Sequence, residues 1–314
     1  MNVIDQVITD KYAAYHGDCA EALRGIPSDS IHYSIFSPPF ASLYTYSNSE
    51  RDMGNVRDEK EFFEHFAFAI DELYRVMKPG RLLSMHCMLL PTSKERDGYI
   101  GLKDFRGDLV RAFRARGFIF HSEVAIWKDP VTAMQRTKAL GLLHKTIRKD
   151  SAMSRQGIND YLVTMRKPGA NDEPIAHTHE EFPVEMWQRY ASPVWVTTNG
   201  IDDEGFAKCA HDIDPSDTLQ YRSAREHDDE RHVCPLQLEV IRRSVRLWTN
   251  PNDIVLTPFG GIGSEGVVAL EEGRRAVLVE LKRSYYEQQV RNLAAAVNKN
   301  DRQLDMFDMI GAAE

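Results

Sequence analysis

The sequence is poor in cysteine and has neither long apolar runs nor a basic, apolar leader. Four cysteines are scattered over 314 residues, too few for the disulfide framework of a secreted domain. We therefore expect the protein to reside in a reducing cytoplasm. No stretch approaches the roughly 18 apolar residues of a membrane span. The opening residues, MNVIDQVITDKYAAYHGD, predict no signal peptide.

The chain also lacks the net positive charge of many nucleic-acid-binding proteins, because its formal net charge is −8. The charge is uneven, however. Residues 128–168 contain nine Lys or Arg against three acids, whereas residues 171–231 contain fifteen acids against five Lys or Arg. The first segment is either a phosphate-binding surface or an ordinary solvated face. The candidates for phosphate contacts are Arg136, Lys138, Lys145, Arg148, Lys149 and Arg155.

Strand and helix patterns alternate in two parts of the chain, which predicts an α/β fold with a doubly wound, mostly parallel sheet. Apolar residues at helical spacing predict an amphipathic helix over residues 59–77, ended by Lys78-Pro79-Gly80. Residues 130–231 lack this alternation. We therefore expect one α/β domain, built from residues 1–129 and 232–314, with residues 130–231 inserted between its two halves.

The stretch DIVLTPFGGIGSEGVVALEEGRRAVLVEL, residues 253–281, carries a glycine loop. Gly261, Gly263 and Gly266 form G-x-G-x-x-G between a predicted strand and a predicted helix, and Glu280 ends the next strand. Glycines allow a tight turn and a close approach to a ligand, and an acid at that position can bind both hydroxyls of a ribose. NAD and S-adenosylmethionine both carry a ribose. The preceding Thr257-Pro258-Phe259-Gly260 places an aromatic ring beside the loop and favours S-adenosylmethionine.

A second motif, Ser37-Pro38-Pro39-Phe40, ends the predicted strand at residues 31–36. Each proline fixes φ and removes an N–H donor, so the loop is stiff and rich in acceptors. Such a loop suits a substrate NH₂ group, and an aromatic ring can stack on a planar heterocycle. Acceptors around an aromatic amine free its lone pair to attack a methyl group. Catalysis would then depend mainly on positioning, without a strong base.

Together these residues resemble the β-type, permuted family of DNA amino-methyltransferases, which make N6-methyladenine or N4-methylcytosine. Ser37-Pro38-Pro39-Phe40 matches the family's (Asp/Asn/Ser)-Pro-Pro-aromatic catalytic motif. Residues 257–263 match its cofactor motif Asp-Pro-Phe-x-Gly-x-Gly, except that Thr257 replaces the usual acid. Glu280 matches its ribose-binding acid. Residues 15–36 resemble the segment that leads into the family's catalytic motif, and the resemblance implies that Asp18 contacts the cofactor. The catalytic motif precedes the cofactor motif, which is the β-type order.

The resemblance implies a Rossmann-like methyltransferase fold, S-adenosylmethionine as cofactor and double-stranded DNA as substrate. Residues 130–231 would be the target-recognition region, and the target base would flip out of the duplex. Adenine N6 is slightly favoured over cytosine N4, and a homodimer is expected by analogy. The recognition sequence and any partner endonuclease are not determined by the sequence.

Two other interpretations stay open at this point. A nicotinamide-dependent oxidoreductase would use the glycine loop but would leave Ser37-Pro38-Pro39-Phe40 without a role. A DNA-binding regulator with a methyltransferase fold would not need both motifs intact. No metal site is expected, because the pairs Cys209–His211 and His232–Cys234 are separated by one residue, whereas zinc pairs are typically separated by about two to four.

Overall fold

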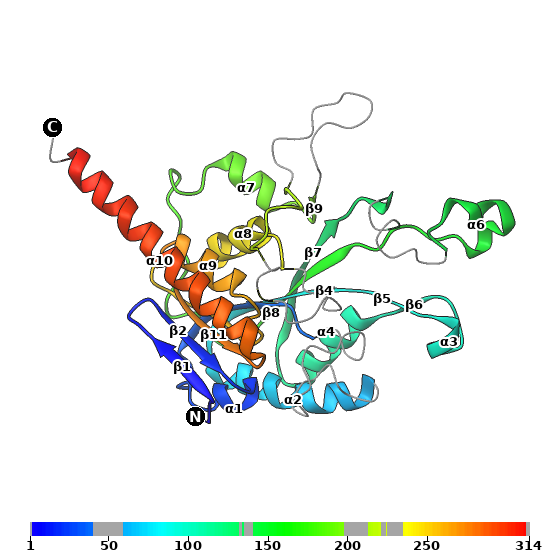
Figure 1. The fold of residues 1–314 in the computed structure, drawn as a ribbon, viewed down its shortest axis with the longest axis horizontal. Helices are drawn as coiled ribbons and strands as arrows, with labels where there is room; N and C mark the ends of the chain where they lie inside the picture. Colours follow the sequence, from blue (N-terminus) through cyan, green and yellow to red (C-terminus); the bar gives the residue numbers. More distant parts are fainter. Residues whose placement is uncertain are drawn as a thin grey trace.

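A nine-stranded sheet organises the chain (Figure 1). The computed structural model describes residues 2–39, 59–131, 134, 141–197, 213–220, 224 and 235–311. The strand order is β1-β2-β11-β10-β3-β4-β8-β7-β9, and β5 pairs with β6 in a separate two-stranded sheet. The strands are β1 (Asp5–Ile8), β2 (Tyr12–His16), β3 (Ile31–Phe36), β4 (Met77–Met88), β5 (Leu90–Pro91), β6 (Leu102–Lys103), β7 (Ile119–Trp127), β8 (Asp160–Arg166), β9 (Val194–Val196), β10 (Ile254–Thr257) and β11 (Arg275–Glu280).

The helices follow the predicted alternation with the strands. They are α1 (Cys19–Leu23), α2 (Glu59–Val76), α3 (Lys94–Asp97), α4 (Phe105–Ala115), α6 (His144–Lys149), α7 (Val184–Tyr190), α8 (Leu238–Trp248), α9 (Ser264–Glu271) and α10 (Arg283–Gly311). The amphipathic helix α2 ends at Val76, just before the predicted stop. Among the described residues, no helix is long and apolar enough to cross a bilayer.

The sheet is mostly parallel, as the alternation predicts. Strands β2, β11, β10, β3 and β4 run parallel in that order. Strand β8 is antiparallel to β4 and to β7, and β1 is antiparallel to β2. Strands β8 and β9 come from residues 130–231, yet both belong to the main sheet. Part of that region therefore extends the sheet beyond β4.

Side chains on the two faces of the sheet form two apolar cores. On β3, Phe36 packs into the core beneath α1, α2 and α4, whereas Tyr33 and Ile35 pack into the core beneath α8, α9 and α10. The two helix layers flank the sheet in Figure 1. Because successive strand residues point to opposite faces, the side chain of Ser37 continues the row of Tyr33 and Ile35.

A buried cluster of charges lies at the amino ends of the central strands. The side chain of Arg81 is fully buried, with Nη1 3.2 Å from Asp253 and Nη2 3.6 Å from Glu173. His32 Nε2 lies 3.1 Å from Glu173, and burial lowers the pKa of His32. The Arg81 guanidinium makes no well-directed hydrogen bond with a described residue, so these contacts are ionic. The positive charge of Arg81 between the two carboxylates makes this an ion-pair cluster rather than a cation site.

We expect Arg81→Met to lower the free energy of unfolding by about 3–5 kcal/mol, because it leaves Asp253 buried without its cation. Lys78→Met is the matched control. Lys78 pairs with the half-exposed Glu173, so its loss should cost about 1 kcal/mol or less. Urea unfolding followed by circular dichroism measures both variants. Equal losses of stability in the two variants would contradict the view that Arg81 is the cation that compensates the buried Asp253.

Candidate active site

The glycine loop joins the carboxyl end of β10 to α9. Gly261 has φ +50° and Gly263 has φ +92°, a region of backbone conformation that favours glycine. A Cβ on Gly261 would meet nothing within 4 Å, so a ligand can approach the backbone there. A Cβ on Gly266 would lie 2.8 Å from side chains of β11 and α10, so this glycine permits close packing of α9. The backbone conformations of Gly261 and Gly263 and the close packing at Gly266 are the features for which glycine is required here.

Glu280 ties the end of β11 to the glycine loop. Its Oε2 accepts a hydrogen bond of 2.7 Å from the Gly261 N–H, and its Oε1 accepts one of 2.8 Å from the Lys282 N–H. The Gly260 N–H donates to the Val279 carbonyl at 2.7 Å. A carboxylate is an acceptor of the kind that ribose hydroxyls need.

Asp18 reaches the same edge of the sheet through β2. The Gly17 N–H donates to the Glu280 carbonyl at 2.9 Å, which brings the start of α1 beside the end of β11. The Asp18 carboxylate caps α1 by accepting from the Glu21 N–H at 3.1 Å. Asp18 and Glu280 also act together on the buried Cys19, whose pKa burial raises first and these two charges raise further. Both predicted cofactor-binding acids therefore lie near Cys19.

The catalytic motif begins where β3 ends, directly beside the cofactor motif. Strands β3 and β10 are neighbours, with Ser34 paired to Leu256. The rings of Phe36 and Phe259 pack against each other with centroids 5.7 Å apart. Ser37 and Pro39 are half-buried, and Pro38 is buried. Phe40, predicted as a stacking ring, lies outside the described residues.

Thr257, the departure from the family's acidic residue, sits at the end of β10. Its side chain is buried, and its hydroxyl has no hydrogen-bond partner within the described residues. A buried polar group without a partner costs free energy unless a ligand or water completes its bonding. Together with Glu280 and the open approach to Gly261, this hydroxyl fits a polar nucleoside cofactor.

A polar row that the sequence analysis did not predict continues from Ser37 across the sheet. The register pairs Phe36 with Met85, which brings Ser37 beside His86. Ser37 Oγ lies 3.1 Å from His86 Nδ1, and His86 Nε2 lies 2.8 Å from Asp160 Oδ2. Lys128 forms an ion pair with the same oxygen of Asp160. The row therefore joins the end of β3, β4, the start of β8 and the residue after β7.

Burial would favour the neutral form of Asp160, which is only 3 % exposed. The charges and hydrogen bonds of His86 and Lys128 outweigh that effect and hold the pKa of Asp160 below its ordinary value. Asp160 is therefore an ionised carboxylate in the folded protein. The histidine in the apolar run RLLSMHCMLL was a signal that could have indicated the row.

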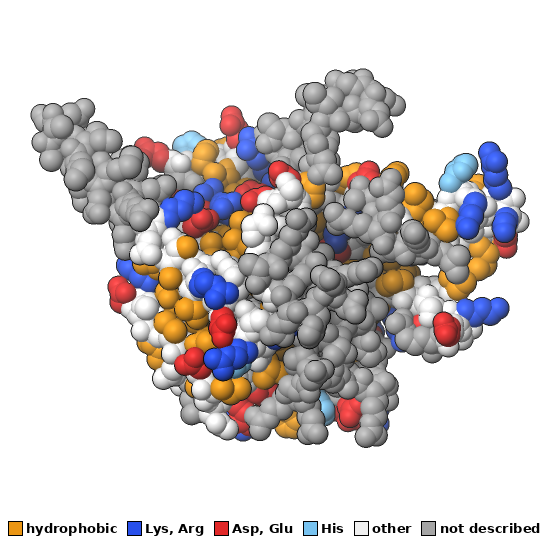
Figure 2. Space-filling view, in the orientation of Figure 1, with side chains coloured by type: hydrophobic (Ala, Val, Ile, Leu, Met, Phe, Trp, Pro, Cys, Tyr) orange, Lys and Arg blue, Asp and Glu red, His pale blue; other side chains and the backbone are white. Residues whose placement is uncertain are grey.

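The predicted phosphate-binding residues fall in different environments. Lys145, Arg148 and Lys149 are exposed on α6, in an arm that extends from β7 and β8 (Figure 1). Lys and Arg side chains gather at the tip of this arm in Figure 2. Arg155 is half-buried, its Nη1 donates to the Gln156 carbonyl at 3.2 Å, and burial lowers its pKa. Arg136 and Lys138 lie outside the described residues, as do Cys209, His211, His232 and Cys234.

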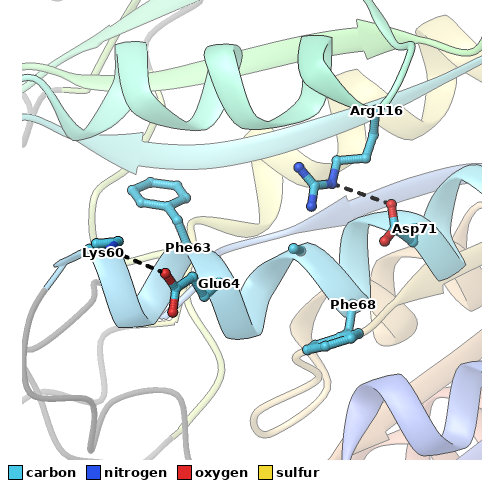
Figure 3. A pocket seen from close by; sticks show the side chains of 7 residues that line it. Lys60, Phe63, Glu64, Phe68, Asp71 and Arg116 are labelled. Carbon is cyan, nitrogen blue, oxygen red and sulfur yellow. Dashed lines mark ion pairs between the residues drawn. The ribbon is translucent and has the colours of Figure 1, made fainter.

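A pocket lies along α2 and reaches Arg116, and no residue of either motif lines it (Figure 3). Phe63 and Phe68 line it together with two ion pairs, Lys60–Glu64 at 3.7 Å and Arg116–Asp71 at 3.3 Å. These charged groups already pair with each other and are at least one-third exposed, apart from any catalytic motif. We assign this pocket no part in the candidate active site.

Glu265, in the first turn of α9, is a buried acid that the sequence did not single out. Burial raises its pKa from 4.5 to about 7, and a hydrogen bond from its own backbone amide offsets this only in part. Its stabilising contribution is fully present below the unfolded pKa. That contribution is lost as the pH rises toward 7, because the unfolded chain ionises first.

We therefore expect the Glu265→Gln variant to gain stability relative to the native chain as the pH rises. A pKa raised from 4.5 to about 7 corresponds to about 3 kcal/mol of change between about pH 4.5 and pH 7. Urea unfolding of both proteins at several pH values gives the difference directly. Parallel pH dependences for the two proteins would show that Glu265 ionises normally.

Comparison with known proteins agrees with this geometry. A family model described as DNA methylase matches residues 31–291. The DNA adenine methyltransferase YhdJ of Escherichia coli is 21 % identical over 298 residues, covering 92 % of this chain and 85 % of that protein.

Two solved structures have the same fold. A protein of Thermus thermophilus, TTHA0409, solved in complex with S-adenosyl-L-methionine, aligns with a TM-score of 0.61 and 23 % identity, covering 90 % of this chain and 94 % of that one. The cytosine-N4-specific PvuII DNA methyltransferase aligns with a TM-score of 0.61 and 17 % identity, covering 95 % and 96 % of the two chains. At these identities the likenesses establish the fold.

Proposed function

This chain belongs to the N6/N4 DNA methylase family, and from that premise we propose that it methylates adenine N6 at a specific sequence in double-stranded DNA. The enzyme is a DNA amino-methyltransferase that uses S-adenosylmethionine. The choice of base and the roles of individual residues are the parts that we propose.

One observation carries the proposal: the acceptor-rich loop and the glycine loop follow neighbouring strands at the same edge of the sheet. Leu256 of β10 pairs with Ser34 of β3, and the rings of Phe36 and Phe259 connect the two loops. Ligands of open α/β sheets bind outside the carboxyl ends of the strands. A nucleoside cofactor at one loop would therefore lie beside an amino group at the other.

S-adenosylmethionine, when bound, supplies an electrophilic methyl group on a sulfonium. Glu280 would accept from its ribose hydroxyls, the backbone at Gly261 would approach it closely, and Thr257 and Asp18 would offer further polar contacts. Ser37 and the carbonyl groups of the Pro38-Pro39 segment would accept from the target NH₂ group. Holding both reactants in one geometry is the main contribution of such a site to the rate.

Adenine and cytosine present similar amino groups, and two observations favour each base. The β-type order of motifs is dominated by adenine enzymes, and the relative YhdJ, which matches most of this chain, is a DNA adenine methyltransferase. Serine at the first motif position is commoner in cytosine-N4 enzymes, and the PvuII enzyme is specific for cytosine N4. Cytosine N4 is therefore the second candidate.

The arm that carries α6 is proposed to bind the DNA backbone. Lys145, Arg148 and Lys149 are spaced three and four residues apart, so they share one side of the helix. Target recognition by residues 130–231, pairing of two copies and association with the nucleoid belong to the same proposal and rest on the family resemblance. A partner endonuclease is not implied by any described residue.

The first test incubates the protein with unmethylated genomic DNA and S-adenosylmethionine, followed by digestion and mass spectrometry of the nucleosides. We expect N6-methyladenine. N4-methylcytosine would replace adenine by cytosine as the target. Ser37→Ala should reduce the product by about 100-fold or more while binding of S-adenosylmethionine is retained, because one acceptor for the target amine is lost. Full activity of Ser37→Ala, or no modified base from a protein that binds the cofactor, would contradict the proposal.

We also expect the triple variant Lys145→Gln, Arg148→Gln and Lys149→Gln to bind DNA with a smaller salt dependence. Each phosphate contact contributes about 0.9 to the slope of log K against log salt concentration, so the slope should fall by roughly 2–3. Fluorescence anisotropy over a salt series measures it. The matched control replaces Lys60, Arg283 and Lys299, three exposed cations elsewhere on the surface. An unchanged slope for the arm variant would remove α6 from the DNA interface.

A further inference from the structure

We propose that His86 acts through Ser37 in methyl transfer: it directs the serine hydroxyl toward the target amine as an acceptor and takes up the proton that the amine releases. This inference rests on the proposed function. It goes beyond the motif, which assigns no role to a histidine on β4. The proposal rests on the polar row formed by Ser37, His86, Asp160 and Lys128.

The direction of each hydrogen bond follows from the chemistry of Asp160. An ionised carboxylate can only accept, so His86 Nε2 carries the hydrogen and donates to Asp160. In the neutral ring, Nδ1 then has a free lone pair. The Ser37 O–H is therefore the donor in the 3.1 Å contact with His86 Nδ1. The lone pairs of Ser37 Oγ stay available for a substrate N–H.

Lys128 is a second cation beside Asp160, because it forms an ion pair with the same carboxylate oxygen that faces His86 Nε2. The Asp160 carboxylate therefore has a cationic partner that does not depend on the charge of the His86 ring. Within the described part of the chain, two charged groups face His86: Asp160 from β8 and Lys128 from the end of β7. The uncharged Ser37 faces it from the end of β3.

The amine nitrogen forms a bond to the methyl carbon, the carbon–sulfur bond breaks with its electron pair on sulfur, and the nitrogen becomes cationic. The nitrogen then gives a proton to Ser37 Oγ while the Ser37 hydroxyl proton moves to His86 Nδ1. The products are the neutral methylamine, the serine hydroxyl and an imidazolium paired with Asp160. The side chain of His86 is 13 % exposed, so the ring can return its proton to water.

Other polar contacts on the same face of the sheet differ from this row. Tyr33, Ser84 and Thr164 form a hydrogen-bonded chain with contacts of 2.8 and 2.9 Å, and all three are buried. That chain joins strands without reaching the catalytic loop. The His86 row ends on Ser37, which is half-buried at the loop itself.

The test is a double-mutant cycle on single-turnover methyl transfer with Ser37→Ala, His86→Asn and the double variant. If His86 acts through Ser37, each single variant loses about 100-fold and the double variant loses little more than either one. A purely structural role for His86 would give losses that multiply. Titration calorimetry with S-adenosylmethionine identifies variants that remain folded and bind the cofactor.

The pH profile gives a second, independent result. The asparagine amide offers an acceptor near the position of Nδ1 but cannot carry the proton. A group must be unprotonated to take up a proton, so the native rate should fall at low pH, whereas the His86→Asn rate should stay flat. Identical profiles, or multiplicative losses in the cycle, would overturn the proposal.

A second histidine–serine pair provides the matched control. His121 Nδ1 lies 2.8 Å from Ser122 Oγ on the exposed part of β7, so His121→Asn should leave the rate and its pH profile unchanged. The outcomes also separate the two proposals. A native protein that methylates no amino group in DNA refutes the proposed function. If the protein methylates DNA but the losses of the two single variants multiply in the double variant, only the role of His86 is refuted.

Discussion

The register of β10, β3 and β4 is the constraint on which the site depends. Leu256 pairs with Ser34, and Phe36 pairs with Met85, so the loops that follow β10 and β3 lie at the same edge of the sheet, while β4 continues beside them to Met88. A shift of one residue would reverse which side chains face each core. Phe36 and Ile35 are both fully buried, in different cores, so that shift is strongly disfavoured. The register is thereby fixed by the same apolar packing that stabilises the domain.

The two ends of the central strands hold different kinds of polar group. At the amino ends, the buried Arg81 forms ion pairs with the buried Asp253 and the half-exposed Glu173. At the carboxyl ends, the buried Thr257 hydroxyl has no hydrogen-bond partner within the described residues. Charged groups thus pair with each other at one end, and at the other end an uncharged hydroxyl needs a ligand or water to complete its bonding.

Much of the fold and the positions of both motifs could be predicted from local patterns. Helix α2 follows from its apolar spacing, and the glycine loop follows from Gly261, Gly263 and Gly266. Strand β8 was missed because it lies in a segment without the helix–strand alternation. His86 and Asp160 were missed for a different reason: their contact joins residues 74 positions apart, and only the sheet order brings them together. The departure at Thr257 gave no such difficulty, because the threonine ends β10 where the motif requires.

The strand order has a consequence for how the protein is made. Strands β10 and β11 lie between β2 and β3, although they come from the far part of the sequence. The bond from Ser34 to Leu256 spans 222 residues. During synthesis, the facing edges of β2 and β3 therefore have no partner until residues 254–280 have left the ribosome. Unpaired strand edges can form hydrogen bonds with strands of other chains. Pairing between strands this far apart in the sequence is expected to slow folding and to leave strand edges open to aggregation while the chain is incomplete.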